Sequence, residues 1–350
     1  MKVQTSEYCA VGHPDRLCDY AVSYILDRYL EHDPNARVAL ELQLKDANAT
    51  LSGEVTSTYR YTHGELAEFV REAIRKVGYT DEYRDKWGEG NTISGSGVEV
   101  TVHVSQQSGD IAQGVNRDGW GDQGIFHGMA VNDRKHGFMP LDYWLAREIG
   151  TALYRSDWGG QDVKTQVTVI DGTPVECVVA IPLDPVTEYD MRNLITSYVK
   201  MLAGDACEVI INGTGRYVTH GPIGDCGTTG RKLVADFYGG NSKIGGGSPW
   251  GKDPTKADVT LNILARMKAL DYLKEHGLDE VHCAICCCIG RAQIRVSFFD
   301  GKGELLDSRI EGDPPSHIIE QLGLRSPDYA ERCKRGLFGF EDKWPAVTSP

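Results

Sequence analysis

The stretch ARVALELQLKDANATLSGEVTS, residues 36–57, contains two runs of alternating apolar and polar side chains, separated by the turn-forming residues 46–48. Alternation with a period of two is typical of strands that bury one face, so the stretch predicts a β-hairpin. Helical periods flank it at residues 13–33 and 66–77, and another alternating run follows at 98–104. This order predicts a sheet with helices packed on one face.

The same order of elements returns later in the chain. KTQVTVIDGTPVECVVAI predicts a second hairpin that turns at residues 171–172, and VHCAICCCIGRAQIRVSFF predicts a third that turns at residues 300–303. The helices predicted around them cover 140–154, 189–202, 254–275 and 316–322, with a strand at 207–212. We therefore predict an α+β fold of three similar domains in a pseudo-threefold arrangement, each a sheet covered by helices on one face.

Length and turn spacing set the predicted domain limits. The 350 residues exceed what one hydrophobic core usually organises. The hairpin turns are about 125 residues apart, the size of one small domain. The predicted domains cover residues 1–108, 119–222 and 223–345, and segments are expected to interchange between them.

Composition excludes several classes of protein. A formal net charge of −13 would repel polyanions over most of the surface, so neither a nucleic-acid nor a membrane partner is expected. No apolar run approaches the roughly 18 residues that span a bilayer, and the N-terminus lacks a signal-peptide run. We expect a soluble, cytoplasmic protein with reduced cysteines. Cys283 and Cys286 have zinc-like spacing, but no second pair follows them.

Two predicted helix starts carry the residues expected of an anion site. GGGSPWGKDPTKAD, residues 245–258, leads into a helix with Lys252, Lys256 and Asp258, and His13 and Asp15 occupy the corresponding start of the first helix. Free N–H groups at a helix start bind phosphate, and a carboxylate beside phosphate suits Mg²⁺. The alternative that each aspartate only favours the helix dipole remains open.

Other polar clusters add donors. GPIGDCGTTGRK places Asp225 before a glycine turn and then Arg231 and Lys232, which suits polyphosphate. Asp162 and Lys164 stand at the entry of a predicted strand, where a lysine can also simply face solvent. Two polar, glycine-bounded loops of the kind that close over small ligands carry Gln107 and Asp122.

These motifs resemble those of the S-adenosylmethionine synthetases (methionine adenosyltransferases) along nearly the whole chain. They are TSEYCAVGHPDR, GDQG, DVKTQVT, GPIGDCGTTGRK, YGG, GGGSPWGKDPTKAD and FGFEDKWPA, in the family's order. The resemblance implies three similar α+β domains and a homodimer, often paired into a tetramer, with active sites between subunits. It implies that methionine and ATP form S-adenosylmethionine and triphosphate, which is then hydrolysed, with two Mg²⁺ per site and K⁺.

The resemblance also implies a role for individual residues. Those implied to act in catalysis are His13, Lys164, Arg231 and Lys252. Those around ATP are His13, Asp162, Lys164, Arg216, Tyr217, Asp225, Arg231, Lys232, Ser248 and Lys252. Those around methionine are Glu54, Gln107, Asp122, Asp225 and Lys256. The implied metal ligands are Asp15 and Asp258 for Mg²⁺ and Glu41 for K⁺.

Some segments depart from the family pattern. Arg16 stands where lysine is usual, SQQSGD replaces KQSPD, and CCCIGRAQIRV lacks an AIGVAEP-type continuation. Two rival functions fit part of the pattern: a metal-dependent polyphosphate or nucleotide hydrolase, and a silent nucleotide-binding subunit. Glu54, Gln107 and Lys256 speak against the first, because a hydrolase has no use for a methionine site. The complete set of residues predicted to bind phosphate and metal speaks against the second.

Overall fold

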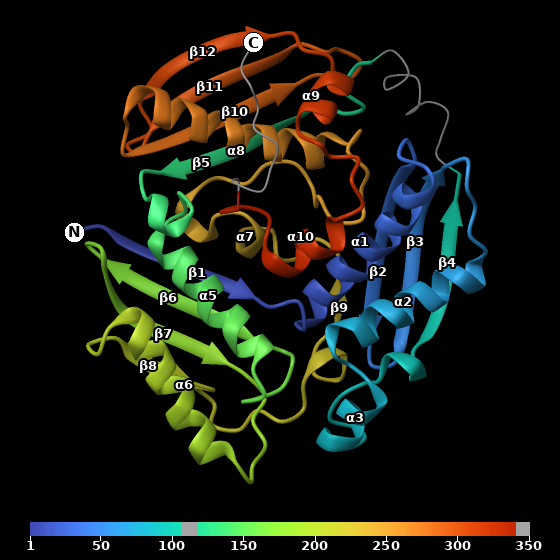
Figure 1. Cartoon of the computed structure of the whole chain (residues 1–350), viewed down its shortest axis with the longest axis vertical. Coiled ribbons are helices and arrows are strands. Elements are labelled where there is room, and N and C mark those ends of the chain that lie inside the picture. Colours follow the sequence, from blue (N-terminus) through green and yellow to red (C-terminus); the bar gives the residue numbers. More distant parts are fainter. Residues whose placement is uncertain (107–117, 341–350) are drawn as a thin grey trace.

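The computed structural model describes residues 1–106 and 118–340, so Gln107 lies outside the described residues. Its strands form three four-stranded sheets, each with helices on one face (Figure 1). The sheets lie around a centre that holds the helices α1 (Pro14–His32), α7 (Leu233–Asp236) and α10 (Tyr329–Arg335) (Figure 1). The predicted α+β fold of three similar units is confirmed.

The first sheet has the order β4-β3-β2-β9. Its strands are β4 (Glu99–Ser105), β3 (Asn48–Thr56), β2 (Arg37–Lys45) and β9 (Gly227–Thr228), and α1 and α2 (His63–Val77) cover one face, with α3 (Asp81–Trp87) following. On β2, Leu40, Leu42 and Leu44 are buried under the helices, whereas Glu41 and Gln43 between them are exposed. The alternation seen in the sequence thus separates a core face from an open face.

The second sheet has the order β1-β6-β7-β8. Its strands are β1 (Val3–Cys9), β6 (Lys164–Ile170), β7 (Thr173–Ala180) and β8 (Glu208–Ile211), and its helices are α5 (Leu141–Arg155) and α6 (Glu188–Ala203). Asp171 and Gly172 have φ of 46° and 81°. Two successive positive φ values are typical of a type I′ hairpin turn, so the predicted second hairpin is confirmed.

The third sheet has the order β12-β11-β10-β5. Its strands are β12 (Leu305–Glu311), β11 (Ile294–Asp300), β10 (Glu280–Cys287) and β5 (Gly124–Val131), covered by α8 (Ala257–His276), with α9 (Pro315–Gln321) following. The predicted turn at 300–303 is present, but it joins β11 to β12, which pair antiparallel. Residues 288–293 join β10 to β11, and 300–303 lead into β12. The sequence concealed β12 because its exposed Leu305 and Ile310 do not alternate with its polar residues.

Each sheet takes one strand from a distant part of the chain. β9 pairs with β2, β1 with β6, and β5 with β10, all antiparallel. The sheets thus cross the ranges 1–108, 119–222 and 223–345, and the domain limits stay a prediction. None of the described helices is long and apolar enough to cross a membrane.

Candidate active site

The start of α1 lies directly against the segment that enters β6. A Cβ on Gly12 would come within 2.1 Å of the carbonyl oxygen of Gln161, so a larger residue would push the two segments apart. The close approach brings His13 near Asp162 and Lys164, whose charges both act on the imidazole. Glycine at this position therefore assembles predicted residues from two segments about 150 positions apart.

His13 caps the start of α1. Its Nδ1 accepts a hydrogen bond from the backbone N–H of Asp15 at 3.2 Å. Burial lowers the pKa of His13 below its usual value, so the ring is neutral at pH 7. Because Nδ1 accepts, the ring proton sits on Nε2, where it can be donated to a phosphate oxygen.

Asp15, in the first turn of α1, is fully buried and holds the loop that follows β9. Its Oδ1 accepts the backbone N–H of Thr228 at 2.8 Å, and its Oδ2 accepts from Lys232 Nζ at 2.6 Å. Arg231 Nε lies 3.6 Å from Oδ1. Each carboxylate oxygen has two lone pairs, so Asp15 retains acceptor capacity for a cation. We call His13, Asp15, Asp162, Lys164, Arg231 and Lys232 the α1 cluster.

Lys164 opens β6 and pairs with an acid that sequence reasoning missed. Its Nζ lies 2.7 Å from Glu7 Oε2 on β1. Burial works against the charged form, but the hydrogen-bonded Glu7 outweighs it together with nearby acids, so the pKa of Lys164 is raised. Glu7 stands in the TSE part of the first motif, and its register opposite Gln166 came only from the pairing of β1 with β6.

Tyr217, another residue predicted to contact ATP, lies beside Asp162. The buried Asp162 accepts the backbone N–H of Gly221 at 2.9 Å. Burial, and then the charge of Asp162 and its hydrogen bond to the Tyr217 hydroxyl, raise the pKa of Tyr217. The remaining predicted ATP residues are the exposed Arg216 and Asp225, and Ser248, whose side chain lies against Gly230.

A second group of predicted residues lines a cavity of about 590 Å³, which we call the outer cavity. Its predicted members are Glu41, Glu54, Asp122, Lys252, Lys256 and Asp258. Ala39 pairs with Glu54 across β2 and β3, so Glu54 projects on the same face as Glu41. That face is the open face of the first sheet, opposite α1 and α2.

Residues 251–253 run along the first half of β2 and position the Lys252 side chain in the outer cavity. The Leu40 N–H donates to the Gly251 carbonyl, and the Asp253 N–H donates to the Val38 carbonyl, both at 3.0 Å. Lys252, between them, places Nζ 2.7 Å from Asp258 Oδ2.

The other oxygen of Asp258 binds the preceding loop. Oδ1 accepts the Gly247 N–H at 2.7 Å. A Cβ on Gly246, whose φ is +74°, would lie 2.8 Å from this oxygen, so glycine there permits the close approach. Lys256, the N-cap residue of α8, has Nζ 3.3 Å from Asp253 Oδ2.

The structure thus distributes the predicted residues over two places. Lys252, predicted to act with His13, Lys164 and Arg231, lies in the outer cavity and not in the α1 cluster. Within the described ranges, no three His, Cys, Asp or Glu side chains form a ready-made metal site. The individual assignments stay predictions, and a ligand that needs both groups has to bridge them.

Known proteins match along the whole chain. The family model for the N-terminal domain of S-adenosylmethionine synthetase matches residues 1–109, and the one for the C-terminal domain matches residues 219–346. An S-adenosylmethionine synthase of Wolinella succinogenes is 34% identical, covering 96% of this chain and 92% of its own. One of Mesoplasma florum is 32% identical, covering 97% and 96%.

The chain belongs to the S-adenosylmethionine synthetase family.

A solved structure agrees with this assignment. The structure described as an unusual S-adenosylmethionine synthetase from Campylobacter jejuni superposes with a TM-score of 0.86 at 27% identity, covering 99% of this chain and 97% of that one. The resemblance inferred from the motifs is confirmed, and the three-sheet fold extends over both chains.

Arg16, where the S-adenosylmethionine synthetase pattern has lysine, is fully buried and does not face either group of predicted residues. It pairs with Asp236 and, at 3.2 Å, with Asp19, and donates to the Cys333 carbonyl at 2.6 Å. Its guanidinium carbon also lies 5.1 Å from the centre of the Trp250 ring. The departure therefore changes the core that supports the α1 cluster, and not a contact to substrate.

The departing segment CCCIGRAQIRV supplies a wall of the outer cavity. Ile289 lines it and is exposed. The Gly290 N–H donates to the Trp120 carbonyl at 2.8 Å, and the Trp120 N–H donates to the Arg291 carbonyl at 3.1 Å. Sequence reasoning missed Ile289, because an apolar residue in an irregular loop carries no periodic signal.

Proposed function

We propose that this chain is a methionine adenosyltransferase. The thioether sulfur of L-methionine attacks C5′ of ATP, forming S-adenosylmethionine and triphosphate, and the triphosphate is then hydrolysed to phosphate and pyrophosphate. One observation carries this proposal. This chain, which belongs to the family, gathers cationic side chains around Asp15 and carboxylates in the outer cavity. The first group suits a polyphosphate, and the second suits an amino acid whose sulfur becomes positively charged.

The transfer step needs alignment and charge stabilisation but no general base. The S–C5′ bond forms as the C5′–O bond breaks, and the electron pair of that bond stays on the triphosphate oxygen. Lys164, Arg231 and Lys232 supply positive charge for this leaving group, and His13 supplies its Nε2–H. Preorganised donors of this kind typically contribute about 3 to 4 kcal/mol each.

The outer cavity serves the other partner in the reaction. Sulfur becomes a sulfonium cation in the transition state, so nearby carboxylates stabilise it more than they stabilise neutral methionine. Glu54 and Asp122 are the acids we assign to methionine, with Lys256 beside them and Ile289 as an apolar wall.

The carboxylates fit the implied cations. We assign Asp15 and Asp258 to two Mg²⁺ ions and Glu41 to K⁺. Both aspartates lie beside a lysine and keep unused lone pairs, as expected of residues that share a hard cation with phosphate oxygens. When bound, Mg²⁺ neutralises and orients the phosphates.

A homodimer with active sites between subunits brings the α1 cluster of one subunit to the outer cavity of the other. The outer cavity opens on the exposed face of the first sheet, and in the α1 cluster the Arg231 and Lys164 side chains are 50% and 41% exposed. A two-fold axis can set one subunit's outer cavity against the partner's α1 cluster and so complete two sites at once. Pairing of two such dimers gives the tetramer expected from the resemblance.

We also propose that the protein acts in the cytoplasm. Its ten cysteines all fall within the described residues and are free, which suits a reducing compartment.

The test of the function is direct. Purified protein is incubated with ATP, methionine, Mg²⁺ and K⁺, and S-adenosylmethionine is sought by mass spectrometry. We expect the product together with phosphate and pyrophosphate. ATP loss without S-adenosylmethionine would establish the hydrolase instead, and nucleotide binding without turnover would establish the silent subunit.

A further inference from the structure

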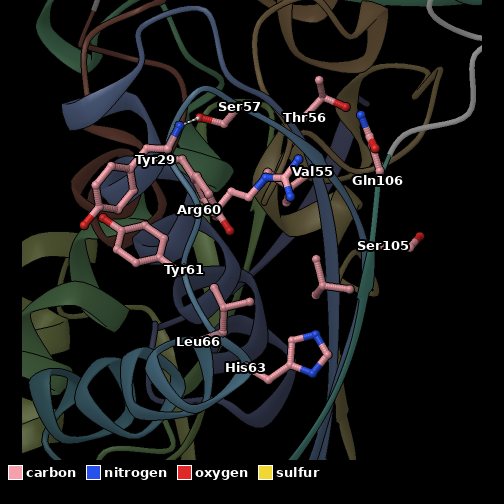
Figure 2. A pocket seen from close by; sticks show the side chains of 12 residues that line it. Tyr29, Val55, Thr56, Ser57, Arg60, Tyr61, His63, Leu66, Ser105 and Gln106 are labelled. Atoms are coloured by element: carbon pink, nitrogen blue, oxygen red, sulfur yellow. Dashed lines mark hydrogen bonds between the residues drawn. The ribbon is translucent and has the colours of Figure 1, made fainter.

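A separate cavity of about 280 Å³ lies at the end of the first sheet where β3 and β4 finish near the start of α2 (Figure 2). We call it the Arg60 cavity. It is lined by Tyr29, Val55, Thr56, Ser57, Tyr59, Arg60, Tyr61, His63, Leu66, Val104, Ser105 and Gln106. Val55 and Glu54 are consecutive on β3 and point to opposite faces. The sheet itself therefore separates the Arg60 cavity from the outer cavity.

One wall of the Arg60 cavity is a fixed aromatic surface. The ring of Tyr61 meets the buried Tyr29 edge-on, with ring centres 5.0 Å apart, and its hydroxyl donates to the Arg28 carbonyl at 3.1 Å. Tyr59 stacks on His32 at 4.2 Å and 12°. Leu66 and Val55 extend this wall. The apolar surface is thus already formed, so a flat ligand would find it without rearrangement.

The charge of the cavity is the opposite of the chain's. Of the residues that the structure describes, Arg60 and His63 line it and no carboxylate does. The outer cavity, by contrast, contains Glu41, Glu54 and Asp258 among its acids. Two acids near the Arg60 cavity are engaged elsewhere. Asp33 accepts hydrogen bonds from Ser57 and Thr58, and Glu65 accepts the Thr62 N–H in a capping box at the start of α2.

Among the described residues Arg60 therefore has no counter-charge, in a protein with a net charge of −13. Its side chain is exposed and forms no ion pair or hydrogen bond with any described residue. Figure 2 shows it extending from the loop toward β3, with Tyr29 and Tyr61 on one side and Thr56 and Gln106 beyond its tip. A guanidinium with free donors, hydroxyl and amide groups at the rim, and an aromatic wall together define a receptor.

We propose that the Arg60 cavity binds a small organic anion that carries one carboxylate or phosphate on a flat apolar body. The anionic group takes the fork of Arg60, which suits both oxyanions. The flat body lies on Tyr61 and Leu66. A zwitterion such as methionine is disfavoured, because no carboxylate lines the cavity to receive its ammonium group.

The test uses fluorinated aromatic probes and ¹⁹F NMR on the intact protein. 4-Fluorobenzoate and 4-fluorophenyl phosphate distinguish the two oxyanions, and 4-fluorobenzamide is the neutral control of the same shape. We expect at least one anion to bind, with the amide about tenfold weaker or more, since a charge-assisted hydrogen bond is lost. Arg60→Gln should weaken the anion by a similar factor. Arg155→Gln, which removes an exposed arginine at the end of α5, should leave binding unchanged.

Three outcomes would overturn the proposal. Equal anion affinity in the wild type and Arg60→Gln would place the probe elsewhere. Equal affinity for the benzamide would remove the role of charge. Binding of inorganic phosphate, but of neither aromatic anion, would remove the role of the apolar wall. Thermal melting of both variants checks that they fold, and because no readout depends on turnover, failure here leaves the proposed function untouched.

Discussion

At the starts of α1 and α8, an aspartate makes the same two kinds of contact in different surroundings. Each has an aspartate in its first turn, one of whose oxygens accepts a backbone N–H, from Thr228 for Asp15 and from Gly247 for Asp258. The other oxygen binds a lysine, Lys232 or Lys252. The Asp15 side chain is 0% exposed, however, whereas that of Asp258 is 20% exposed in an open cavity.

This difference shows that the same local pattern can occur in two unlike environments, one buried and one open. Burial ties Asp15 into the core, because the network around Arg16 fixes the loop that Asp15 holds. Asp258, by contrast, lines the outer cavity and is partly exposed. The dipole interpretation of both aspartates remains compatible with a role at phosphate, since a carboxylate in a first turn favours the dipole in either case.

The largest effect is expected when subunits that carry different substitutions are mixed in one dimer. If each active site joins one subunit's α1 cluster to the partner's outer cavity, Asp15→Asn and Asp258→Asn should each reduce turnover about a hundredfold. Unfolding and refolding the two variants together should restore about a quarter of wild-type activity, because half the dimers are mixed and each has one intact site. Turnover of ATP and methionine, measured on the mixture, checks this.

Each variant refolded alone is the control for that experiment. A mixture no more active than its components would mean that both aspartates act within one subunit's site, or that neither acts.

Stability should separate the same two aspartates. Asp15→Asn leaves Lys232 without its buried counter-charge and should lower the free energy of unfolding by about 3 kcal/mol. Asp258→Asn acts on a partly exposed pair and should change it by less than about 1 kcal/mol. Urea denaturation of both variants measures the difference. Equal losses would show that burial does not distinguish the two helix starts.

Replacing Arg16 by lysine, the usual residue in the family pattern, tests how much the buried network around Arg16 stabilises the fold. The single ammonium group of lysine cannot reach Asp19, Asp236 and the Cys333 carbonyl together, and lysine has no planar group to stack on Trp250. Arg16→Lys should therefore lower the free energy of unfolding by about 2 kcal/mol, although it restores the usual residue. Chemical denaturation checks this, with Arg155→Gln as an exposed control. Unchanged stability would mean that the network contributes little.

The smallest expected effect concerns pH. The pKa of His13 is lowered in the folded state, so below the unfolded value the unfolded chain binds a proton that the folded chain does not. This contribution to stability is present above about pH 6.5 and is lost as the pH falls toward the folded pKa. His13→Asn retains a capping acceptor without titrating, so its stability should fall less than that of the wild type between pH 7 and pH 5. Thermal melts at both pH values measure it, and identical slopes would contradict a buried neutral His13.

Local pattern predicted local structure well, and long-range pairing poorly. The hairpin turn at Asp171–Gly172 followed from its own residues, because few others tolerate two positive φ values. In the third unit the turn at 300–303 was predicted but β12 beyond it was not, because this edge strand exposes Leu305 and Ile310. β1, β5 and β9 were not predicted, because each pairs with a strand far away in sequence. Glu7 was missed for the same reason, and Ile289 was missed because it stands in an irregular loop.

The sequence by itself determined the family, the three α+β units and the identity of most candidate site residues, because motifs and periodicity are local properties of the chain. The tertiary structure alone decided that these residues form an α1 cluster and a separate outer cavity, and that Arg16 is buried beneath the first of them. Both facts depend on strand exchange and on which sheet face the helices cover. Those are set by contacts between distant segments, which local spacing does not encode.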